Sequence, residues 1–280
     1  MLTRRQFLRG AAGMAAATAV TGLYAWQVEP RWVDFVQRPL PIPHLPPSLS
    51  GHILVQISDM HISRRYDWQY QISALQQVQA LSPHFVVYTG DFVTYDTAEQ
   101  TTQLRGLQPH LPLGTLGTAA ILGNHDYGLG WQQTAVADTI TDIVTEFGFT
   151  VLRNQAHSFA GLNIIGLDDF WSPNYAPETV LAAIEPDQPS LVLCHNPDVL
   201  DQPVWGDYVG WVLAGHTHGG QVKPPFLPPP VLPVNNELYS SGEINLGDGR
   251  FLYISRGLGN LWQVRFNARP EITLFTLTAT

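Results

Sequence analysis

Residues 85–91, which read FVVYTGD, indicate most about the fold of this chain. The first five of these residues are continuously apolar, which is typical of a short strand buried on both faces. Another strand is expected at 52–58, and a helix at 68–80 separates the two. This order predicts a βαβ unit, in which Gly90 and Asp91 follow directly after a buried strand.

The same alternation continues on the C-terminal side of this unit. We expect strands at 118–122, 157–160, 162–167, 190–194 and 209–214, helices at 131–147 and 177–184, and a strand-rich end from Tyr239. Helices between the early strands and hairpins among the late ones favour an α/β (α+β) fold with mixed sheets covered by helices.

Residues that can bind metal follow the predicted strands. The motifs are Asp59-Met60-His61, Gly90-Asp91, Gly123-Asn124-His125-Asp126, His195-Asn196 and Gly215-His216-Thr217-His218. Because the carboxyl ends of strands in an α/β sheet share one edge, these loops should meet there. Residues two apart at a strand end point to the same side, so Asp59 and His61 can bind one ion together, as can His216 and His218.

These side chains are carboxylates, imidazoles and one amide, with no thiolate among them. Such donors suit catalytic first-row ions such as Mn, Fe, Zn or Co better than a structural zinc site. Two ions bridged by a carboxylate can activate a water and hold the oxygens of a phosphoryl group. A single Gly-Asp or Asp-x-His is a common turn, but all five motifs in order predict hydrolysis of a phosphate ester.

The order of these motifs resembles the calcineurin-like metallophosphoesterase superfamily over about residues 50–280. Within it, residues 215–221 (GHTHGGQ) and 255–260 (SRGLGN) resemble the bacterial YkuE- and YaeI-like phosphodiesterase group, which joins an N-terminal export signal to this domain. The resemblance implies a four-layer sandwich of two mixed β-sheets flanked by helices.

The resemblance also assigns the residues of a binuclear centre with two divalent metal ions. The first ion would be held by Asp59, His61, Asp91 and His218, and the second by Asp91, Asn124, His195 and His216. Asp91 would bridge the two ions. His125 would be the general acid that protonates the leaving oxygen, oriented by Asp126. The sequence leaves the metal open among Mn, Zn, Fe and Co.

Further residues could contact the substrate. Arg256, among glycines, is a candidate for binding phosphate, with a surface position or a structural ion pair as the alternative. The loop 223–233 holds six prolines and either borders the metal crevice or lies apart from it. Trp68, Trp131, Trp171 and Trp262 lie near loops, where they offer apolar contact to a lipid or a nucleoside or else pack in the core.

The N-terminal residues resemble a targeting signal. Thr3-Arg4-Arg5-Gln6-Phe7-Leu8-Arg9 precedes an Ala-rich stretch over 10–26, which resembles a twin-arginine signal. A basic arm or an ordinary Sec signal is the alternative. We therefore divide the chain into a signal or membrane anchor at 1–28, a Pro-rich linker at 29–49 and a metallophosphoesterase domain at 50–280. Export would place the domain in the periplasm or at the outer face of the cytoplasmic membrane.

The net charge limits the classes of partner that are expected, and the cysteine count limits the disulfides that can form. The formal net charge is −9, and an acidic protein is a poor partner for nucleic acid. The expected partners are a phosphate-ester substrate, the twin-arginine export machinery and a membrane. Cys194, the one cysteine, excludes an internal disulfide and is expected to be a buried strand thiol.

The predicted function is an exported two-metal phosphoesterase that cleaves phosphodiesters or lipid-linked phosphates through a metal-bridging hydroxide. One alternative is a UDP-2,3-diacylglucosamine pyrophosphatase-like hydrolase of lipid A synthesis. Export argues against this alternative, because nucleotide-linked precursors are cytoplasmic. Another is a non-catalytic metal-binding scaffold, which would be expected to have lost ligands or the general acid.

Overall fold

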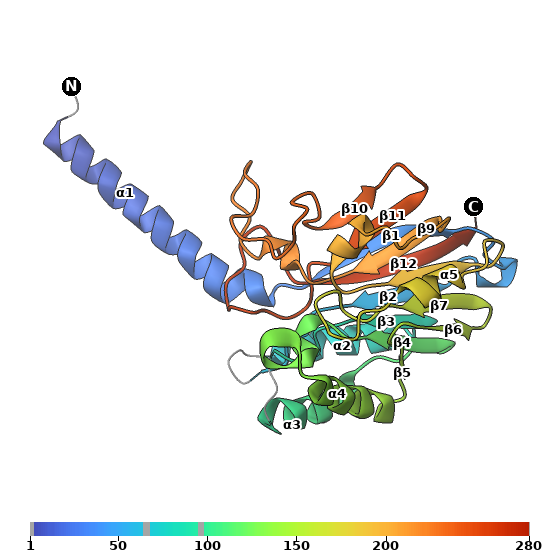
Figure 1. Cartoon of the computed structure of the whole chain (residues 1–280). Coiled ribbons are helices and arrows are strands. Elements are labelled where there is room, and N and C mark those ends of the chain that lie inside the picture. Colours follow the sequence, from blue (N-terminus) through green and yellow to red (C-terminus); the bar gives the residue numbers. More distant parts are fainter. Residues whose placement is uncertain (1–2, 64–67, 95–97, 280) are drawn as a thin grey trace.

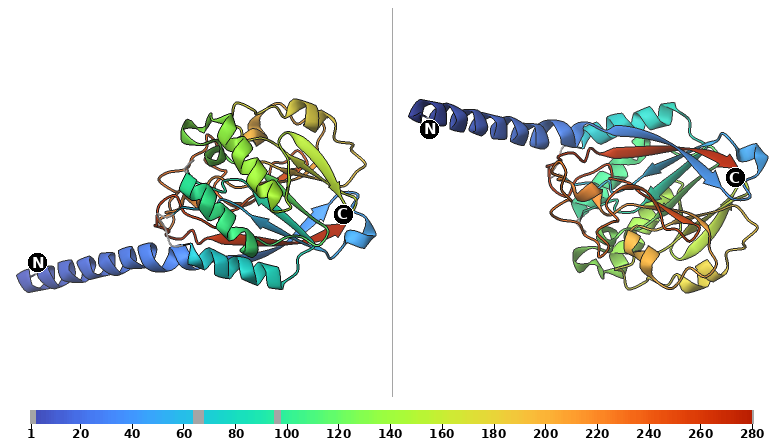
Figure 2. Two further views of the ribbon diagram at one scale, coloured as in Figure 1. Left: turned by 90° about the horizontal axis from the view of Figure 1, so that it is seen from below. Right: turned by 90° about the horizontal axis from the view of Figure 1, so that it is seen from above.

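Two six-stranded sheets lie face to face in the computed structural model, which describes residues 3–63, 68–94 and 98–279 (Figure 1). Met1 and Leu2, at the start of the predicted signal, and Thr280 lie outside the described residues. Helices flank the two sheets (Figure 2), so the structure confirms the predicted α/β sandwich of two mixed sheets.

The first sheet contains the strands that open the domain. Its order is β1 (Asp34–Ile42), β12 (Glu271–Ala279), β2 (Ile53–Ile57), β3 (Phe85–Thr89), β4 (Gly117–Ile121) and β5 (Thr150–Val151). Strands β2 to β5 are parallel, whereas β12 is antiparallel to β2 and parallel to β1. Every residue of β3 is buried, as its apolar run predicted.

The second sheet is formed by later strands. Its order is β10 (Gly242–Asn245), β11 (Arg250–Ile254), β9 (Gly210–Ala214), β8 (Ser190–Leu193), β7 (Leu162–Gly166) and β6 (Gln155–Phe159). The central strands β7, β8, β9 and β11 run parallel, and the two edge strands are antiparallel to their neighbours. Cys194 follows β8 and is buried, as expected.

Three apolar clusters hold these layers together. One packs the helices α2 (Gln69–Ala80), α3 (Ala98–Leu107) and α4 (Thr134–Glu146) on the outer face of the first sheet. A second cluster fills the space between the sheets. A third packs α5 (Glu178–Ala182) and neighbouring loops on the outer face of the second sheet. Burial of this apolar area is the main stabilising contribution to the sandwich.

Short helical turns connect the main elements. They are η1 (Tyr24–Val28), η2 (Glu29–Arg31), η3 (Pro47–Leu49), η4 (Gln108–His110), η5 (Asn124–Tyr127), η6 (Leu129–Trp131), η7 (Pro197–Asp201) and η8 (His218–Gly220). Three of them, η5, η6 and η8, include or adjoin residues of the predicted site.

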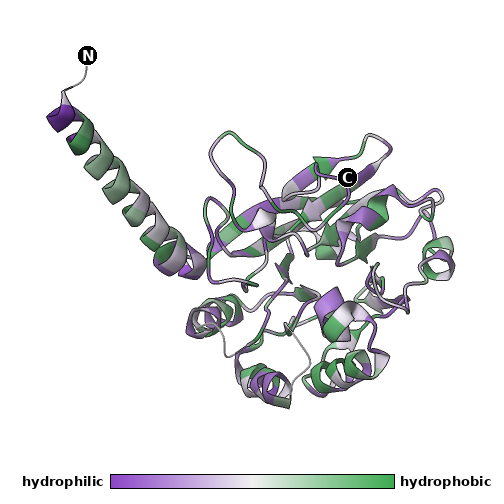
Figure 3. Ribbon diagram, turned by 60° about the vertical axis from the view of Figure 1, so that its left-hand side comes forward, coloured by the Kyte–Doolittle hydropathy of each residue, from purple (hydrophilic) through white to green (hydrophobic). Residues whose placement is uncertain are grey.

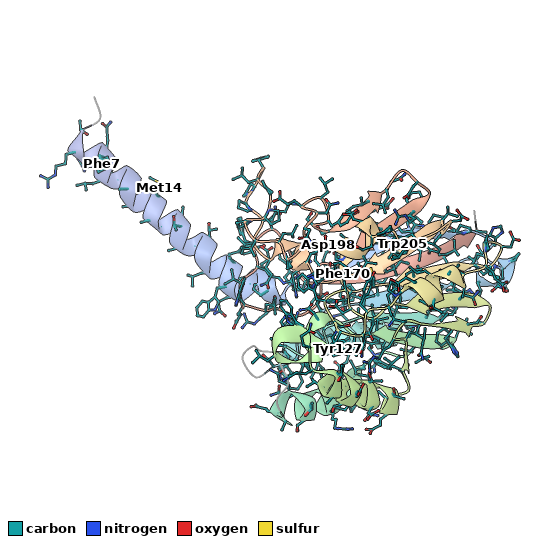
Figure 4. The ribbon with its side chains drawn as sticks, in the orientation of Figure 1. Phe7, Met14, Tyr127, Phe170, Asp198 and Trp205 are labelled. Carbon is teal, nitrogen blue, oxygen red and sulfur yellow. The ribbon has the colours of Figure 1, made fainter. Side chains whose placement is uncertain are left out.

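Helix α1 (Arg4–Leu23) projects from the sandwich and buries none of its residues (Figure 1). The Thr3 hydroxyl accepts the backbone N–H of Gln6, whose side chain accepts the N–H of Thr3 in return, so a capping box starts the helix. Figure 3 shows hydrophilic residues at its start and mainly neutral or hydrophobic ones after them. Phe7 and Met14, which are labelled on this helix in Figure 4, are both exposed. Among the described residues, no helix combines the length and the apolar character that crossing a membrane requires.

The segment 29–49, expected to be a linker, contributes a strand to the domain. Strand β1 pairs with β12 over its whole length, and Leu40 and Ile42 are fully buried between the sheets. Prolines normally weaken a strand, but Pro39 and Pro41 are two residues apart, so their missing N–H groups lie on the same side of the strand. An edge strand can turn that side to solvent, which explains why the proline-rich composition was misleading.

The buried position of Leu40 predicts that this segment stabilises the domain. We expect Leu40→Ala to lower the free energy of unfolding by about 2–5 kcal/mol, because it removes apolar contacts and leaves a cavity. Leu113→Ala, at a side chain that is 49% exposed, is the matched control, with an expected change below about 0.5 kcal/mol. Urea unfolding measures both values, and equal small losses would mean that 29–49 is only a linker.

Candidate metal centre

The metal-binding motifs meet at one end of the sandwich. Strands β2, β3 and β4 of the first sheet and β8 and β9 of the second each end directly before one of them. This is the end from which α1 projects, on the left in Figure 1. All seven predicted ligands are buried there, with at most 4% of any residue exposed; they are Asp59, His61, Asp91, Asn124, His195, His216 and His218.

Asp59, His61 and His218 form a first group of donors. Their ligand atoms all lie within 4.8 Å of one another. The Nε2 atoms of His61 and His218 are 3.0 Å apart, and Nε2 of His218 is 3.4 Å from Oδ1 of Asp59. One carboxylate and two imidazoles therefore face a common point, as metal ligands do.

Asp91, His195 and His216 form a second group with the same spacing. Nε2 of His195 lies 3.1 Å from Oδ2 of Asp91 and 3.3 Å from Nδ1 of His216. The same Asp91 oxygen lies 3.4 Å from Nε2 of His61 in the first group. Asp91 thus lies between the two groups, in the position that the family resemblance assigns to a bridging ligand.

The remaining ring nitrogens of the second group are fixed by carbonyls. Nδ1 of His195 donates to the carbonyl of Thr89 at 2.7 Å, and Nε2 of His216 donates to that of Pro233 at 2.7 Å. Because a carbonyl only accepts, each contact fixes which nitrogen carries the proton and leaves the other for a metal. The Pro233 contact also brings the end of the proline-rich loop 223–233 to the metal centre.

Burial and nearby charges set the protonation of these groups. Burial lowers the pKa of His61 and His216 to about 3 and that of His218 well below its ordinary value. Burial alone would raise the pKa of Asp91, but His195 and His125 hold it well below the ordinary value. The pKa of His195 moves the other way, because burial lowers it but the Asp91 carboxylate raises it well above the ordinary value. His61, His216 and His218 are therefore neutral without metal, whereas His195 would have to lose a proton to bind a divalent ion.

Asn124 supplies a test of whether a metal fits. Its Oδ1 atom is buried and has no hydrogen-bond partner among the residues that the structure describes. A buried amide oxygen without a partner costs free energy, which a metal ion can offset. The residues present therefore fit two divalent ions, and the family resemblance assigns the Asn124 oxygen to the second of them.

The backbone at these ligands is strained. Asp59, His61, Asp91, His216 and His218 all have positive φ values, between 47° and 73°. Residues with a Cβ rarely adopt this conformation, and such strain persists at sites that the surrounding structure holds in place. Two glycines make room beside them, since a Cβ at Gly123 would lie 2.2 Å from Oδ1 of Asp91, and one at Gly215 2.4 Å from Oδ2 of Asp59.

His125 lies at the half-buried rim of the centre, but Asp126 does not orient it as expected. Nδ1 of His125 donates to the carbonyl of Thr94 at 2.7 Å. The Asp126 carboxylate instead accepts the backbone N–H groups of Asp91, Gly123 and Val93. These bonds hold the loops after β3 and β4 together, so Asp126 positions the backbone of the centre. A short acidic side chain beside a turn more readily binds backbone N–H groups than its neighbour's ring.

Arg256 takes part in ion pairs beside β1. Its guanidinium contacts Asp34, at 2.9 Å, and Glu271. These two contacts account for the position of Arg256 as the structural ion pair that the sequence offered as the alternative. Phosphate binding by Arg256 stays a prediction.

Arg265 is a residue of the site that sequence reasoning missed. It is fully buried and donates to the carbonyls of Gly259, at 2.6 Å, and Arg256, while one guanidinium nitrogen lies 3.3 Å from Nδ1 of His218. Its backbone N–H donates to the carbonyl of Ala25 at 2.9 Å. No local motif surrounds Arg265, so only the folded structure reveals its role in positioning the loop beside His218.

Asp169 is a second such residue. It follows β7 as the ligands follow their strands, so the rule that chemistry lies at strand ends could have found it. Burial raises its pKa to about 7, and its Oδ2 atom has no partner among the described residues. Its Oδ1 atom accepts the backbone N–H of Trp171 at 2.9 Å, which fixes the loop beside the second group.

Known proteins are similar to this chain over most of its length. A family model described as calcineurin-like phosphoesterase matches residues 53–220, a range that includes all seven donors. The chain is similar to the uncharacterized metallophosphoesterase YkuE of Bacillus subtilis, with 35% identity over 295 residues that cover 100% of this chain and 99% of YkuE. It is 30% identical to the phosphodiesterase YaeI of Escherichia coli over 99% of this chain and 100% of YaeI. It is 28% identical to the UDP-2,3-diacylglucosamine pyrophosphatase LpxG of Chlamydia trachomatis over 92% of this chain and 93% of LpxG.

The two donor groups predict that metal binding stabilises the fold. Adding Mn²⁺ to metal-free protein at about 100 times its dissociation constant should raise the free energy of unfolding by about 2.7 kcal/mol per independent site. Asp91→Asn should remove most of this gain, because both groups lose a charged donor. Asp187→Asn, at an exposed carboxylate, is the control and should keep it. Thermal unfolding with and without Mn²⁺ measures the gain, and full stabilisation of Asp91→Asn would contradict the bridging position.

Proposed function

The chain belongs to the calcineurin-like phosphoesterase family and is a metal-dependent phosphoester hydrolase, and we propose that it cleaves phosphodiesters or lipid-linked phosphate compounds outside the cytoplasm. The observation that carries this proposal is the buried Asp91 carboxylate, which lies between two groups of imidazoles and carboxylates with His125 at their rim.

Two divalent ions held by these groups would polarise a water and the phosphoryl oxygens. The chain itself fixes the proton donor. Nδ1 of His125 donates to the Thr94 carbonyl, which orients the ring at the rim of the centre, and Nε2 is the atom that would exchange a proton with the substrate. The backbone N–H of His125 donates to Oδ1 of Asp91 at 2.9 Å, so the proton donor is held at a fixed position relative to the proposed bridging carboxylate. This arrangement suits protonation of a leaving oxygen during hydrolysis.

Two relatives support an organic group on each side of the cleaved phosphate. YaeI is named a phosphodiesterase, and LpxG a pyrophosphatase of UDP-2,3-diacylglucosamine. The similarity to LpxG keeps the nucleotide-lipid pyrophosphate as a second candidate substrate. A non-catalytic scaffold is disfavoured, because the seven donors and His125 are all present and the buried donors face one another.

Export is the second part of the proposal. Arg4 and Arg5 begin an exposed helix whose later residues include exposed Met14, Val20 and Leu23. Paired arginines before an apolar stretch support recognition by the twin-arginine machinery, and the exposed apolar side chains support contact with a membrane.

Hydrolysis of matched diesters tests the role of His125. Mn²⁺-loaded protein should cleave bis(4-nitrophenyl) phosphate and diphenyl phosphate. His125→Ala should lose about 10²-fold in kcat/KM on diphenyl phosphate, and less on the nitrophenyl ester, whose leaving group departs without a proton. His157→Ala, at an exposed histidine of β6, is the control. Equal losses on both esters would contradict a role as proton donor.

The same assay distinguishes the candidate substrates. Asp91→Asn should abolish turnover of both diesters, and comparison with 4-nitrophenyl phosphate gives the preference for diesters over monoesters. Turnover of UDP-2,3-diacylglucosamine above that of the simple diesters would favour the second candidate. Failure of the metal-loaded, folded protein to cleave any of these esters would support the scaffold.

Fractionation of cells tests export. In a bacterium with a twin-arginine system, the chain should reach the periplasmic or membrane fraction, whereas Arg4→Lys combined with Arg5→Lys should leave it in the cytoplasm. Arg9→Lys is the matched control and should be exported. Unchanged export of the double variant would contradict the twin-arginine route, and the membrane fraction reports on anchoring.

A further inference from the structure

Two tryptophans from separate loops form a stacked pair beside the metal centre. The rings of Trp131 and Trp171 have centroids 4.7 Å apart and planes 20° apart. Trp131 ends η6, in the segment after β4, and Trp171 follows β7. The side chain of Gln132 donates to the carbonyl of Trp171 at 2.9 Å, so the two loops are also tied together next to the rings.

The pair contacts both sides of the centre. The Trp171 ring lies edge to face against His216, with centroids 4.6 Å apart. The Trp131 ring lies edge to face near His125 at 6.3 Å, and His125 in turn lies 5.0 Å from His61. The stacked indoles therefore extend from the proton donor to a donor of the second group.

Core packing does not account for these indoles. Among the residues that the structure describes, Trp68, Trp205 and Trp211 belong to the three apolar clusters or pack against them, whereas Trp131 and Trp171 do neither. Trp131 stays 37% exposed. A large apolar ring that keeps this exposure at the edge of a catalytic centre offers apolar area for a ligand to cover.

The backbone at Trp131 is held in an unusual conformation. Its φ is +60°, and Gly128 and Gly130 on its N-terminal side have φ values of +69° and +75°. A bulky residue rarely adopts a positive φ, and strain of this kind gathers at functional sites. The loop thus holds the indole beside His125 at a cost in conformational energy.

From this geometry we propose that Trp131 and Trp171 form a wall that binds a large apolar ester group of the substrate on its leaving side. The proposal rests on the phosphoesterase function, because His125 protonates the leaving oxygen and the group attached to that oxygen must lie beside Trp131. An aromatic ring, as in a nucleoside, or an alkyl chain, as in a lipid, shares the required chemistry. The wall gives the enzyme a preference for bulky apolar esters over small ones.

Binding of three phosphonates to the Mn²⁺-loaded full chain tests the wall without turnover. Methylphosphonate reports on the metal centre alone, benzylphosphonate adds a flat ring, and hexylphosphonate adds a chain. By isothermal titration calorimetry, we expect the benzyl or the hexyl compound to bind the wild type about tenfold more tightly than the methyl compound. The tighter of the two identifies a ring or a chain as the preferred group.

Substitutions at the wall assign this preference to the indole. Trp131→Ala should reduce it to about twofold or less, whereas Trp131→Phe should keep most of a preference for the benzyl compound. Trp32→Ala, which removes an indole that is 52% exposed beside Arg269, should leave the preference unchanged. An unchanged affinity for methylphosphonate shows that each variant keeps its metal centre, and a variant that loses it is replaced by Trp131→Leu, with a reduced preference for the benzyl compound expected.

Two results would overturn the proposal in different ways. Equal binding of all three phosphonates by the wild type, or a preference that survives in Trp131→Ala, would show that the indoles do not contact the ester group while leaving the phosphoesterase function intact. Absence of binding by all three would contradict the phosphoryl site itself and the wall with it.

Discussion

The centre of this protein depends on one buried negative charge, the carboxylate of Asp91. Removing a carboxylate from water is costly unless opposite charge and hydrogen-bond donors surround it. Here His195 and His61 approach one oxygen, and the backbone N–H of His125 donates to the other. The backbone N–H of Asp91 is itself held by Asp126. The position of this single side chain therefore fixes both donor groups and the proton donor beside them.

The two donor groups around Asp91 each combine residues from loops of both sheets. The first donor group takes Asp59 and His61 from the loop after β2 and His218 from the loop after β9, and the second takes Asp91 from one sheet and two histidines from the other. Apolar packing aligns the sheets face to face, while the donors require their ends to coincide within a few ångströms. Strained backbone at five ligands is the local cost of satisfying both demands.

Sequence reasoning predicted the parts of this design that follow from local pattern. Buried strands appear as apolar runs, and each donor follows such a run, so these runs predicted mixed sheets covered by helices and loops that meet at one edge, while the family resemblance supplied the number of sheets. Three features could not, because they depend on contacts between distant segments. Strand β1 is defined by its pairing with β12, more than 200 residues later in the chain. Asp126 is defined by the loop it binds, and Arg265 by the carbonyls that surround it.

The bond from Arg265 to Ala25 links the predicted signal or anchor to the metal centre, which would matter if the N-terminus were cleaved. It ties the turn after α1 to the residue whose guanidinium lies beside His218, and the buried Glu29 adds a bond to the N–H of Ala268. A cut within α1 would leave both contacts in place. A cut after Ala25 would remove the bond to Arg265, whose guanidinium lies beside His218 of the first donor group. Ala25 lies inside residues 1–28, the predicted signal or anchor, so removal of that whole segment would break the bond from Arg265 and keep the bond between Glu29 and Ala268.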